Sequence, residues 1–221
     1  MKKPLVVIFL GKPGSGKGTQ AELLGKKLGL DCVGSGDLLR ERKEKKDFTG
    51  EKLSIVVDTG GLTPTPVIFK LWLDKFEELK AKKNLKGFVM DGSPRKILEA
   101  YLIDEALEWY EWDKNVKIML IDISDKEVIW RLTKRRICKK CEEIFPYLGK
   151  FRDIKKCPKC GGELIKRVDD TVSGVKNRLA WFTTDVQPVI NYYRKTGRLI
   201  KINGEQSIED VFKDIFKLLN F

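Results

Sequence analysis

The sequence predicts an α/β fold in which a parallel sheet of about five strands is flanked by helices on both faces. Short continuous apolar runs, typical of strands buried on both faces, alternate with segments of helical pattern. A glycine-rich loop also joins the first apolar run to the first helical segment, and four cysteines interrupt the alternation late in the chain. The expected strands are Pro4–Leu10, Asp31–Val33, Gly87–Asp91, Val116–Ile123 and Leu199–Ile202.

The helical segments follow these strands in regular order. The last one begins at Ser207, where Asp210 three residues later completes a capping box. Pro188 lies inside a long candidate helix and predicts a break, because proline cannot donate the helical hydrogen bond. The expected helices are Gln20–Leu28, Pro66–Lys83, Ile97–Trp109, Lys126–Arg135, Thr171–Thr196 and Ser207–Leu219.

Two inserts interrupt this alternation and divide the chain into a core and two smaller parts. The core is expected at 1–33, 66–133 and 171–221, the first insert at 34–65 and the second insert at 134–170. Inserts at the rim of such a sheet favour closing segments that exclude water from a site. We therefore expect a flap and a lid around a central site.

The loop from Gly11 to Gln20, which reads GKPGSGKGTQ, indicates a phosphate-binding site. Its glycines let backbone N–H groups converge on an anion, Lys17 adds a positive charge, and the following helix presents its positive end. The strict P-loop pattern places Ser or Thr directly after the lysine, whereas Gly18 stands there and Thr19 comes next. The fold class predicted from this loop is P-loop NTPase-like, and the alternative is a chance glycine-rich turn.

Composition narrows the function further. The 221 residues contain no histidine, which removes Ser-His and Cys-His catalysis but not phosphoryl transfer, where positioning and charge neutralisation suffice. The formal net charge of +12 lies largely in mixed Lys/Glu segments, which favours solvated helix faces over a nucleic-acid surface. No apolar stretch approaches the about 20 residues that span a bilayer, and the N-terminus reads as a strand rather than a signal peptide. We expect a cytoplasmic protein with no membrane partner.

The cysteines predict a structural metal site. Cys138, Cys141, Cys157 and Cys160 form two Cys-x-x-Cys pairs with zinc-ribbon spacing. The second insert is too short for a core of its own, so a metal would supply its fold. Two disulfides or free thiols are the alternatives, and the choice between zinc and iron stays open. The fifth cysteine, Cys32, has apolar neighbours and is expected in the core.

Several ordered motifs together resemble those of the adenylate kinases of bacterial type with a long zinc-bearing lid, within the nucleoside monophosphate kinases. The loop matches G-x-P-G-x-G-K-G-T-Q without a gap. Further matches are Gly34 to Arg40 with S-T-G-D-x-L-R and Gly87 to Arg95 with G-F-x-x-D-G-F-P-R. Others lie at Arg131–Arg136, Arg167–Asp170, Asn177–Leu179 and Ile202–Gln206. The resemblance implies magnesium-dependent transfer from ATP to a nucleoside monophosphate.

The resemblance also implies a role for particular residues. Catalysis would involve Lys17, Arg95, Arg135, Arg167 and Arg178. ATP would be bound by Gly14, Ser15, Gly16, Lys17, Gly18, Thr19, Arg131, Arg135 and Gln206. AMP would be bound by Ser35, Gly36, Arg40, Gly61, Thr63, Gly92, Arg95, Glu99, Arg167 and Arg178. Asp91 would hold magnesium through water, and Asp169 and Asp170 would serve lid hinging and orient the lid arginines.

Four departures from the family pattern concern the acceptor and the lid. Ser93 replaces the phenylalanine of D-G-F-P-R, Lys134 replaces the glycine of L-T-G-R-R, and 60–66 lack the acidic pair of G-x-L-V-x-D-E. Glu99 stands where the family has glutamine, and a carboxylate only accepts hydrogen bonds unless it is protonated. Weakened AMP preference is one interpretation. The other is that Glu99 turns away from the base, or accepts only the N6 hydrogen of adenine while backbone groups bind the rest of the base.

The function implied is ATP + AMP to two ADP by a monomer. A kinase for GMP, CMP or UMP is the alternative within the class. A zinc-ribbon nucleic-acid-binding protein on a kinase scaffold and a regulatory P-loop hydrolase are the alternatives outside it.

Overall fold

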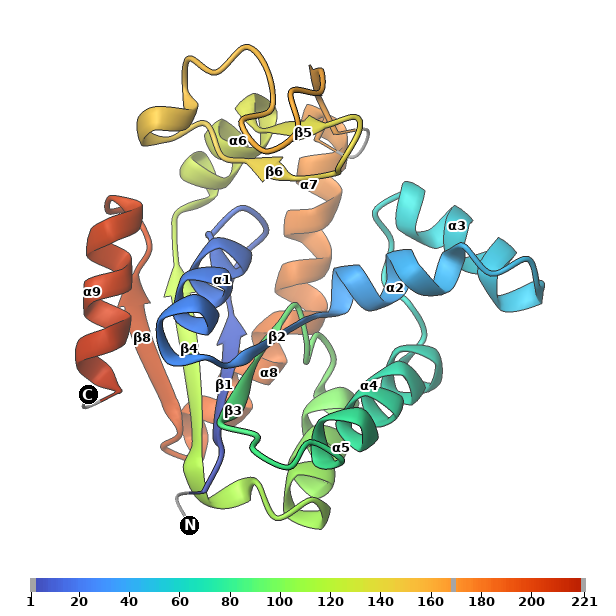
Figure 1. Cartoon of the computed structure of the whole chain (residues 1–221), viewed down its shortest axis with the longest axis vertical. Helices are drawn as coiled ribbons and strands as arrows, with labels where there is room; N and C mark the ends of the chain where they lie inside the picture. Colours follow the sequence, from blue (N-terminus) through green and yellow to red (C-terminus); the bar gives the residue numbers. More distant parts are fainter. Residues whose placement is uncertain (1–2, 168–169, 220–221) are drawn as a thin grey trace.

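The computed structural model describes residues 3–167 and 170–219, and its centre is a five-stranded parallel sheet (Figure 1). The strand order is β2-β3-β1-β4-β8, so the first strand of the chain lies in the middle. All five expected strands are present, with small shifts at their ends. Their bounds are β1 Leu5–Leu10, β2 Asp31–Gly34, β3 Gly87–Asp91, β4 Val116–Asp122 and β8 Leu199–Asn203.

Helices cover both faces of the sheet because the strands are apolar on both sides. Val6, Ile8 and Leu10 of β1 face one core, and Leu5 and Val7 face the other. The first core is closed by α4, α5 and α8, and the second by α1 and α9 (Figure 1). These helices span α1 Lys17–Leu28, α4 Thr65–Lys80, α5 Ile97–Trp109, α8 Gln187–Lys195 and α9 Ile208–Leu218.

The expected long helix before β8 is interrupted where the sequence predicts a break. It consists of α7 (Val172–Trp181), a π-helical turn (Phe182–Val186) and α8. Pro188 falls in the first turn of α8, where a backbone N–H is not required. The π-turn therefore accommodates the proline without ending the helical path.

The two inserts project from the rim at which the sheet strands end (Figure 1). The first insert folds as two helices, α2 (Ser35–Lys43) and α3 (Phe48–Asp58). The second follows α6 (Asp125–Lys134) and forms a three-stranded antiparallel sheet in the order β6-β5-β7. Its strands are β5 Arg136–Cys138, β6 Ile144–Phe145 and β7 Leu164–Ile165, and short 3-10 turns lie at Gly149–Phe151 and, before β4, at Asp113–Asn115.

The expectation that Cys32 packs in the core is wrong. Its side chain is exposed, because β2 is an edge strand, and its thiol donates to the Ala21 carbonyl of α1 at 3.1 Å. Within the described part of the chain, none of the helices is long and apolar enough to cross a membrane.

Candidate active site

The glycine-rich loop lies between β1 and α1, at the edge where the parallel strands end. Gly14 and Gly16 adopt φ values of 77° and 97°, which side chains rarely tolerate. Gly16 caps α1, and the first turn of this helix, which contains Gly18 and Thr19, carries no acidic residue. The positive end of the helix is therefore left to an anion.

Lys17 opens α1 and folds back over the loop. Its ammonium donates to the carbonyl oxygens of Gly11 and Lys12, each at 2.9 Å, and lies 3.4 Å from the Ser15 hydroxyl. Burial lowers the pKa of this ammonium from 10.5 to about 8; Asp91 opposes the shift and nearby arginines add to it. A negatively charged phosphate bound beside Lys17 would therefore stabilise the charged form of this buried ammonium.

Asp91 ends β3 opposite the loop. Its Oδ1 is buried without a hydrogen-bond partner among the described residues, and burial raises the pKa of its carboxyl group. A Cβ on Gly18 would lie 3.1 Å from its Oδ2, which gives a physical reason for glycine where the strict pattern has Ser or Thr. An unpaired buried carboxylate oxygen beside a phosphate loop fits a hydrated magnesium ion.

The loop after β3 meets the start of α2. The Ser35 hydroxyl donates to Ser93 Oγ at 2.7 Å, and both side chains are fully buried. Arg40 of α2 pairs with Asp37 one turn earlier, directly over Gly36. Ser93 therefore ties the first insert to the β3 loop.

Arg95 is held against the body of the protein. Its Nε donates to the Gly92 carbonyl at 2.7 Å, and its guanidinium carbon lies 5.5 Å from the ring centroid of Trp181. Burial lowers the pKa of this guanidinium, Glu99 and Asp91 oppose that effect, and Arg167 adds to it. A pocket is lined by Lys17, Arg95 and Arg178 together with Gly92 and Trp181.

Glu99 lies in the first turn of α5 with 4% of its surface exposed. Its Oε2 accepts the backbone N–H of Arg95 at 2.7 Å, which satisfies a donor at the start of the helix. Burial raises the pKa of the carboxyl group, against the effect of that hydrogen bond and of the Arg95 charge. One oxygen is thus committed to the backbone, and the acid form is favoured relative to an exposed glutamate.

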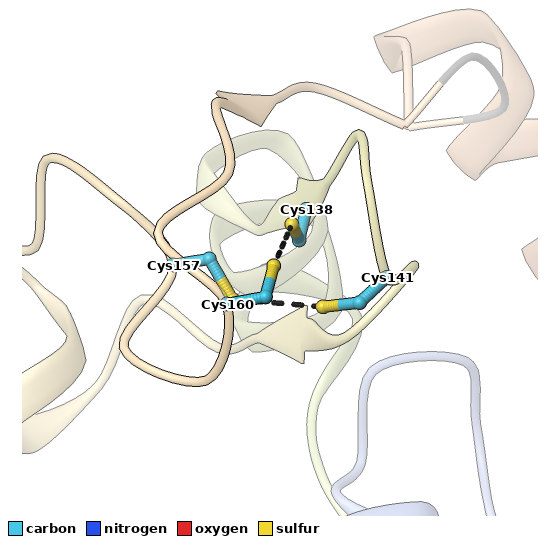
Figure 2. Close-up of side chains that lie close together, drawn as sticks. All are labelled: Cys138, Cys141, Cys157 and Cys160. Carbon is cyan, nitrogen blue, oxygen red and sulfur yellow. Dashed lines mark hydrogen bonds between the residues drawn. The ribbon is translucent and has the colours of Figure 1, made fainter.

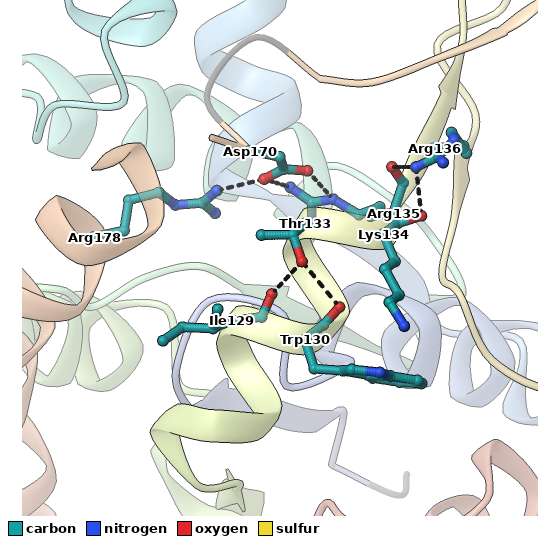
Figure 3. A network of polar contacts seen from close by, with 8 residues as sticks. All are labelled: Ile129, Trp130, Thr133, Lys134, Arg135, Arg136, Asp170 and Arg178. Carbon is teal, nitrogen blue, oxygen red and sulfur yellow. Dashed lines mark hydrogen bonds and ion pairs between the residues drawn. The ribbon is translucent and has the colours of Figure 1, made fainter. Parts of the chain in front are cut away.

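Arg135 and Arg178 converge on one carboxylate (Figure 3). Asp170 accepts from Arg135 Nε and Nη2, each at 2.7 Å, and from Arg178 Nη1 at 3.1 Å. Its side chain is only 1% exposed, so the ion pairs are shielded from water. The structure brings together the end of α6 and the start of α7, as the predicted orienting role for Asp170 requires. Asp169 lies outside the described residues.

Lys134 lies over two aromatic rings, of which Figure 3 shows that of Trp130. Its ammonium is 4.9 Å from the ring centroid of Trp130 on α6 and 5.2 Å from that of Tyr147 in the second insert. Arg152 lies 5.7 Å from the Trp130 centroid. These cation–π contacts join the insert to the core helix at the point where the family pattern has glycine.

A second cavity, of about 340 Å³, is lined by Arg131 and Gln206. Arg131 is fixed by Glu127, which accepts from its Nε at 2.7 Å, and by the Gly204 carbonyl, which accepts from its Nη2 at 2.8 Å. Phe151 of the second insert lines the same cavity, which therefore offers a flat cation and a ring to a planar ligand.

The segment after α3 retains a polar group for a ligand. Thr63 is 7% exposed, and its hydroxyl oxygen is buried without a partner among the described residues. The Gly61 N–H is already bonded to the Val56 carbonyl at 2.9 Å. Of the two predicted residues, Thr63 offers the unsatisfied group.

The four cysteines of the second insert form one cluster (Figure 2). All four Sγ atoms lie within 4.8 Å of one another, and no disulfide joins them. Tetrahedral zinc with Zn–S bonds of about 2.3 Å separates sulfurs by about 3.8 Å, and two of the pairs here are at 3.4 and 3.6 Å. Cys138 and Cys157 form the buried core of the insert with Phe145, and the half-buried Cys141 and Cys160 pack against it, so this donor set fits a structural zinc ion.

Comparison with known proteins agrees with this geometry. The sequence model of the family described as "Adenylate kinase" matches residues 9–198. The chain belongs to the adenylate kinase family. The adenylate kinase of Chlamydia muridarum is 38% identical over 99% of this chain and 88% of its own length. Those of Archaeoglobus fulgidus (35%; 96% and 97%) and Caldicellulosiruptor bescii (36%; 96% and 98%) are similar throughout.

This kinase is therefore a nucleoside monophosphate kinase, an enzyme that transfers a phosphoryl group to a nucleoside monophosphate. Sequence reasoning missed two features of its site: the Trp181 ring against Arg95, and the Trp130–Tyr147 pair around Lys134. A signal for the first was present, since an aromatic residue three positions after Arg178 shares a helix face with it.

Proposed function

We propose that the enzyme catalyses reversible transfer of the γ-phosphoryl group of ATP to AMP, giving two ADP. The observation that carries this proposal is the pocket shared by Lys17, Arg95 and Arg178 at the C-terminal edge of the sheet. Phosphoryl transfer onto a phosphate needs alignment and charge stabilisation rather than a proton acceptor. A half-enclosed set of fixed cations supplies both.

The donor would lie across the glycine-rich loop. Its phosphates meet the N–H groups of Gly14 to Thr19 and the Lys17 ammonium, and its base enters the cavity between Arg131 and Gln206. Lys17, already desolvated, keeps its charge by pairing with the phosphate. Because negative charge develops on the bridging oxygen that leaves with ADP, a fixed cation beside it would stabilise the transition state more than the ground state.

The acceptor would lie between the first insert and α5. Arg40 and Arg95 hold its phosphate, while Arg135, Arg167 and Arg178 close on the group in transit. Asp170 holds Arg135 and Arg178 close together before substrate arrives, so little reorganisation is required on closure. Closure of the flap (34–65) and the lid (134–170) would then exclude water, which otherwise competes as the acceptor.

Magnesium and zinc would have separate places. Asp91 Oδ1 is the group suited to the hydrated magnesium ion that accompanies ATP. Bound there, magnesium would supply charge neutralisation at the phosphates. Zinc on Cys138, Cys141, Cys157 and Cys160 would hold the lid in shape, since four protein ligands leave no open position.

Which base the acceptor monophosphate carries depends, in this proposal, on the protonation state of Glu99. A charged Glu99 would favour a base with two donors, such as guanine, whereas a protonated Glu99 can donate to adenine N1 as glutamine does. Burial raises the pKa of this carboxyl group, so the protonated form that can donate is easier to reach than in an exposed glutamate.

Product analysis with ATP, magnesium and each of AMP, GMP, CMP and UMP, with a no-acceptor control, tests the proposal. We expect ADP to form fastest with AMP and hardly at all without an acceptor. In the wild type, the KM for AMP should rise with pH as Glu99 ionises. Glu99→Gln should leave AMP as the preferred acceptor and flatten this pH dependence. A wild-type preference for GMP that Glu99→Gln abolishes would instead establish the GMP alternative.

A further inference from the structure

Trp181, at the end of α7, lies outside all the sequence motifs that resemble the family. It nevertheless lines the pocket formed by Lys17, Arg95 and Arg178, called the phosphate pocket below. The face of its ring lies 5.5 Å from the guanidinium carbon of Arg95, within the range of a cation–π contact. Both partners are half-buried, and the partial exclusion of water strengthens the attraction.

The contact completes the support of Arg95. The Arg95 Nε donates a hydrogen bond to the Gly92 carbonyl, and the Trp181 ring covers one face of the guanidinium plane. Among residues 3–167 and 170–219, none accepts a hydrogen bond from its two terminal nitrogens. Those nitrogens form the fork that binds phosphate in a bidentate manner. Trp181 thus covers a plane of the guanidinium and leaves its hydrogen-bonding edge to the ligand.

Local features of the fold bring this ring into place. Trp181 is three residues after Arg178, so both side chains lie on one face of α7. The π-turn Phe182–Val186 begins at the next residue, and such turns are frequent at functional sites. Ser93, which lines the same pocket, is small and is bonded to Ser35, so room remains for an indole.

The indole N–H does not explain the choice of tryptophan. Its Nε1 is buried without a hydrogen-bond partner in the described part of the chain, and an unsatisfied buried donor destabilises a protein. The ring face is the part of this side chain that makes a specific contact.

We propose that Trp181 is a positioning residue for the acceptor phosphate: its ring fixes the guanidinium of Arg95 so that the two terminal nitrogens of Arg95 face the monophosphate. The inference rests on the proposed function for its acceptor site, and it does not depend on which base the acceptor carries.

Two substitutions separate the ring face from apolar bulk. Trp181→Phe keeps an aromatic face and removes the unsatisfied N–H, whereas Trp181→Leu keeps apolar volume without a π-system. Trp109→Leu is the matched control, because Trp109 is 80% exposed on α5. KM for AMP, KM for ATP and kcat are measured for each protein, with calorimetric AMP binding and thermal unfolding as readouts independent of turnover.

Trp181→Leu should raise KM and Kd for AMP roughly 3- to 30-fold while KM for ATP changes less than about 2-fold. Trp181→Phe should recover most of the AMP affinity and unfold no earlier than the wild type. Equal AMP affinities of the Phe and Leu variants, or a parallel rise of both KM values, would overturn the inference. Wild-type enzyme that neither binds nor phosphorylates AMP would overturn the proposed function instead, and the comparison would then use the monophosphate that the acceptor panel identifies.

Discussion

Replacing Asp170 by asparagine should destabilise the folded enzyme strongly, because two buried arginines share its charge. Asparagine keeps the size of the side chain and one carbonyl acceptor, so little packing is lost. It removes the negative charge between Arg135 and Arg178, whose side chains are 12% and 14% exposed. The two guanidiniums would then face each other without compensation.

The size of the effect follows from the contacts. Asp170 accepts two hydrogen bonds of 2.7 Å and one of 3.1 Å, all from charged donors, and its side chain is 1% exposed. Breaking a buried ion pair from one side costs about 3–5 kcal/mol. For a chain of this length, each kcal/mol lowers Tm by about 2–4 °C, so a fall of roughly 6–20 °C is expected.

Thermal unfolding of Asp170→Asn measures this change, with Asp74→Asn as the control. Asp74 also pairs with a cation, Lys70, at 2.7 Å, but it is 57% exposed, so its loss should cost less than about 1 kcal/mol. Saturating ATP and magnesium should reduce the difference between Asp170→Asn and wild type, since phosphate oxygens supply the missing charge. If both variants lost the same stability, the interpretation of Asp170 as a buried charge centre would be refuted.

Three further predictions concern the lid and the loop. One equivalent of zinc per chain should be found by elemental analysis, and chelation or Cys157→Ser should expose the second insert to protease while the sheet stays folded; a metal-free lid with unchanged protease resistance would contradict this. Because the pKa of Lys17 is about 8 before a phosphate raises it, ATP binding at pH 8 should take up about half a proton, as calorimetry in buffers of different ionisation enthalpy measures, and Lys17→Arg should take up none. No buffer dependence in the wild type would count against a depressed pKa. Lys134→Gln, which removes the cation between Trp130 and Tyr147, should speed proteolysis of the lid about 2- to 5-fold without changing the global Tm; an unchanged cleavage rate would show that the contact does not hold the lid.

The secondary structure could be predicted closely from local sequence patterns. Alternation of apolar runs and helical segments located all five strands of the sheet, because strands buried on both faces need no distant information to be apolar. Pro188 marked the interruption of the long helix for a similarly local reason. Cys32 was misplaced because an apolar neighbourhood in sequence does not reveal that a strand lies at the edge of its sheet.

Contacts between distant segments could not be predicted in this way. The Ser35–Ser93 pair joins residues 58 positions apart, and Trp181 at the end of α7 contacts Arg95 in the loop after β3. The hydrogen bond from the Arg95 backbone to Glu99 could not be read from the sequence, and its bearing on the acceptor base stays a prediction. Such contacts depend on how the helices pack, and local sequence patterns are compatible with more than one packing arrangement.

The sequence by itself determined which functional motifs the chain carries and in which order: a phosphate loop, arginines in several motifs and a four-cysteine cluster suited to a metal. These are encoded in short spacings, since backbone turns and tetrahedral metal geometry act over a few residues. Only the tertiary structure decided which cations share one carboxylate, which oxygen of Asp91 lacks a partner, and which ring supports Arg95. The physical reason is that burial and charge pairing depend on distances through space, which are set when the whole chain has packed.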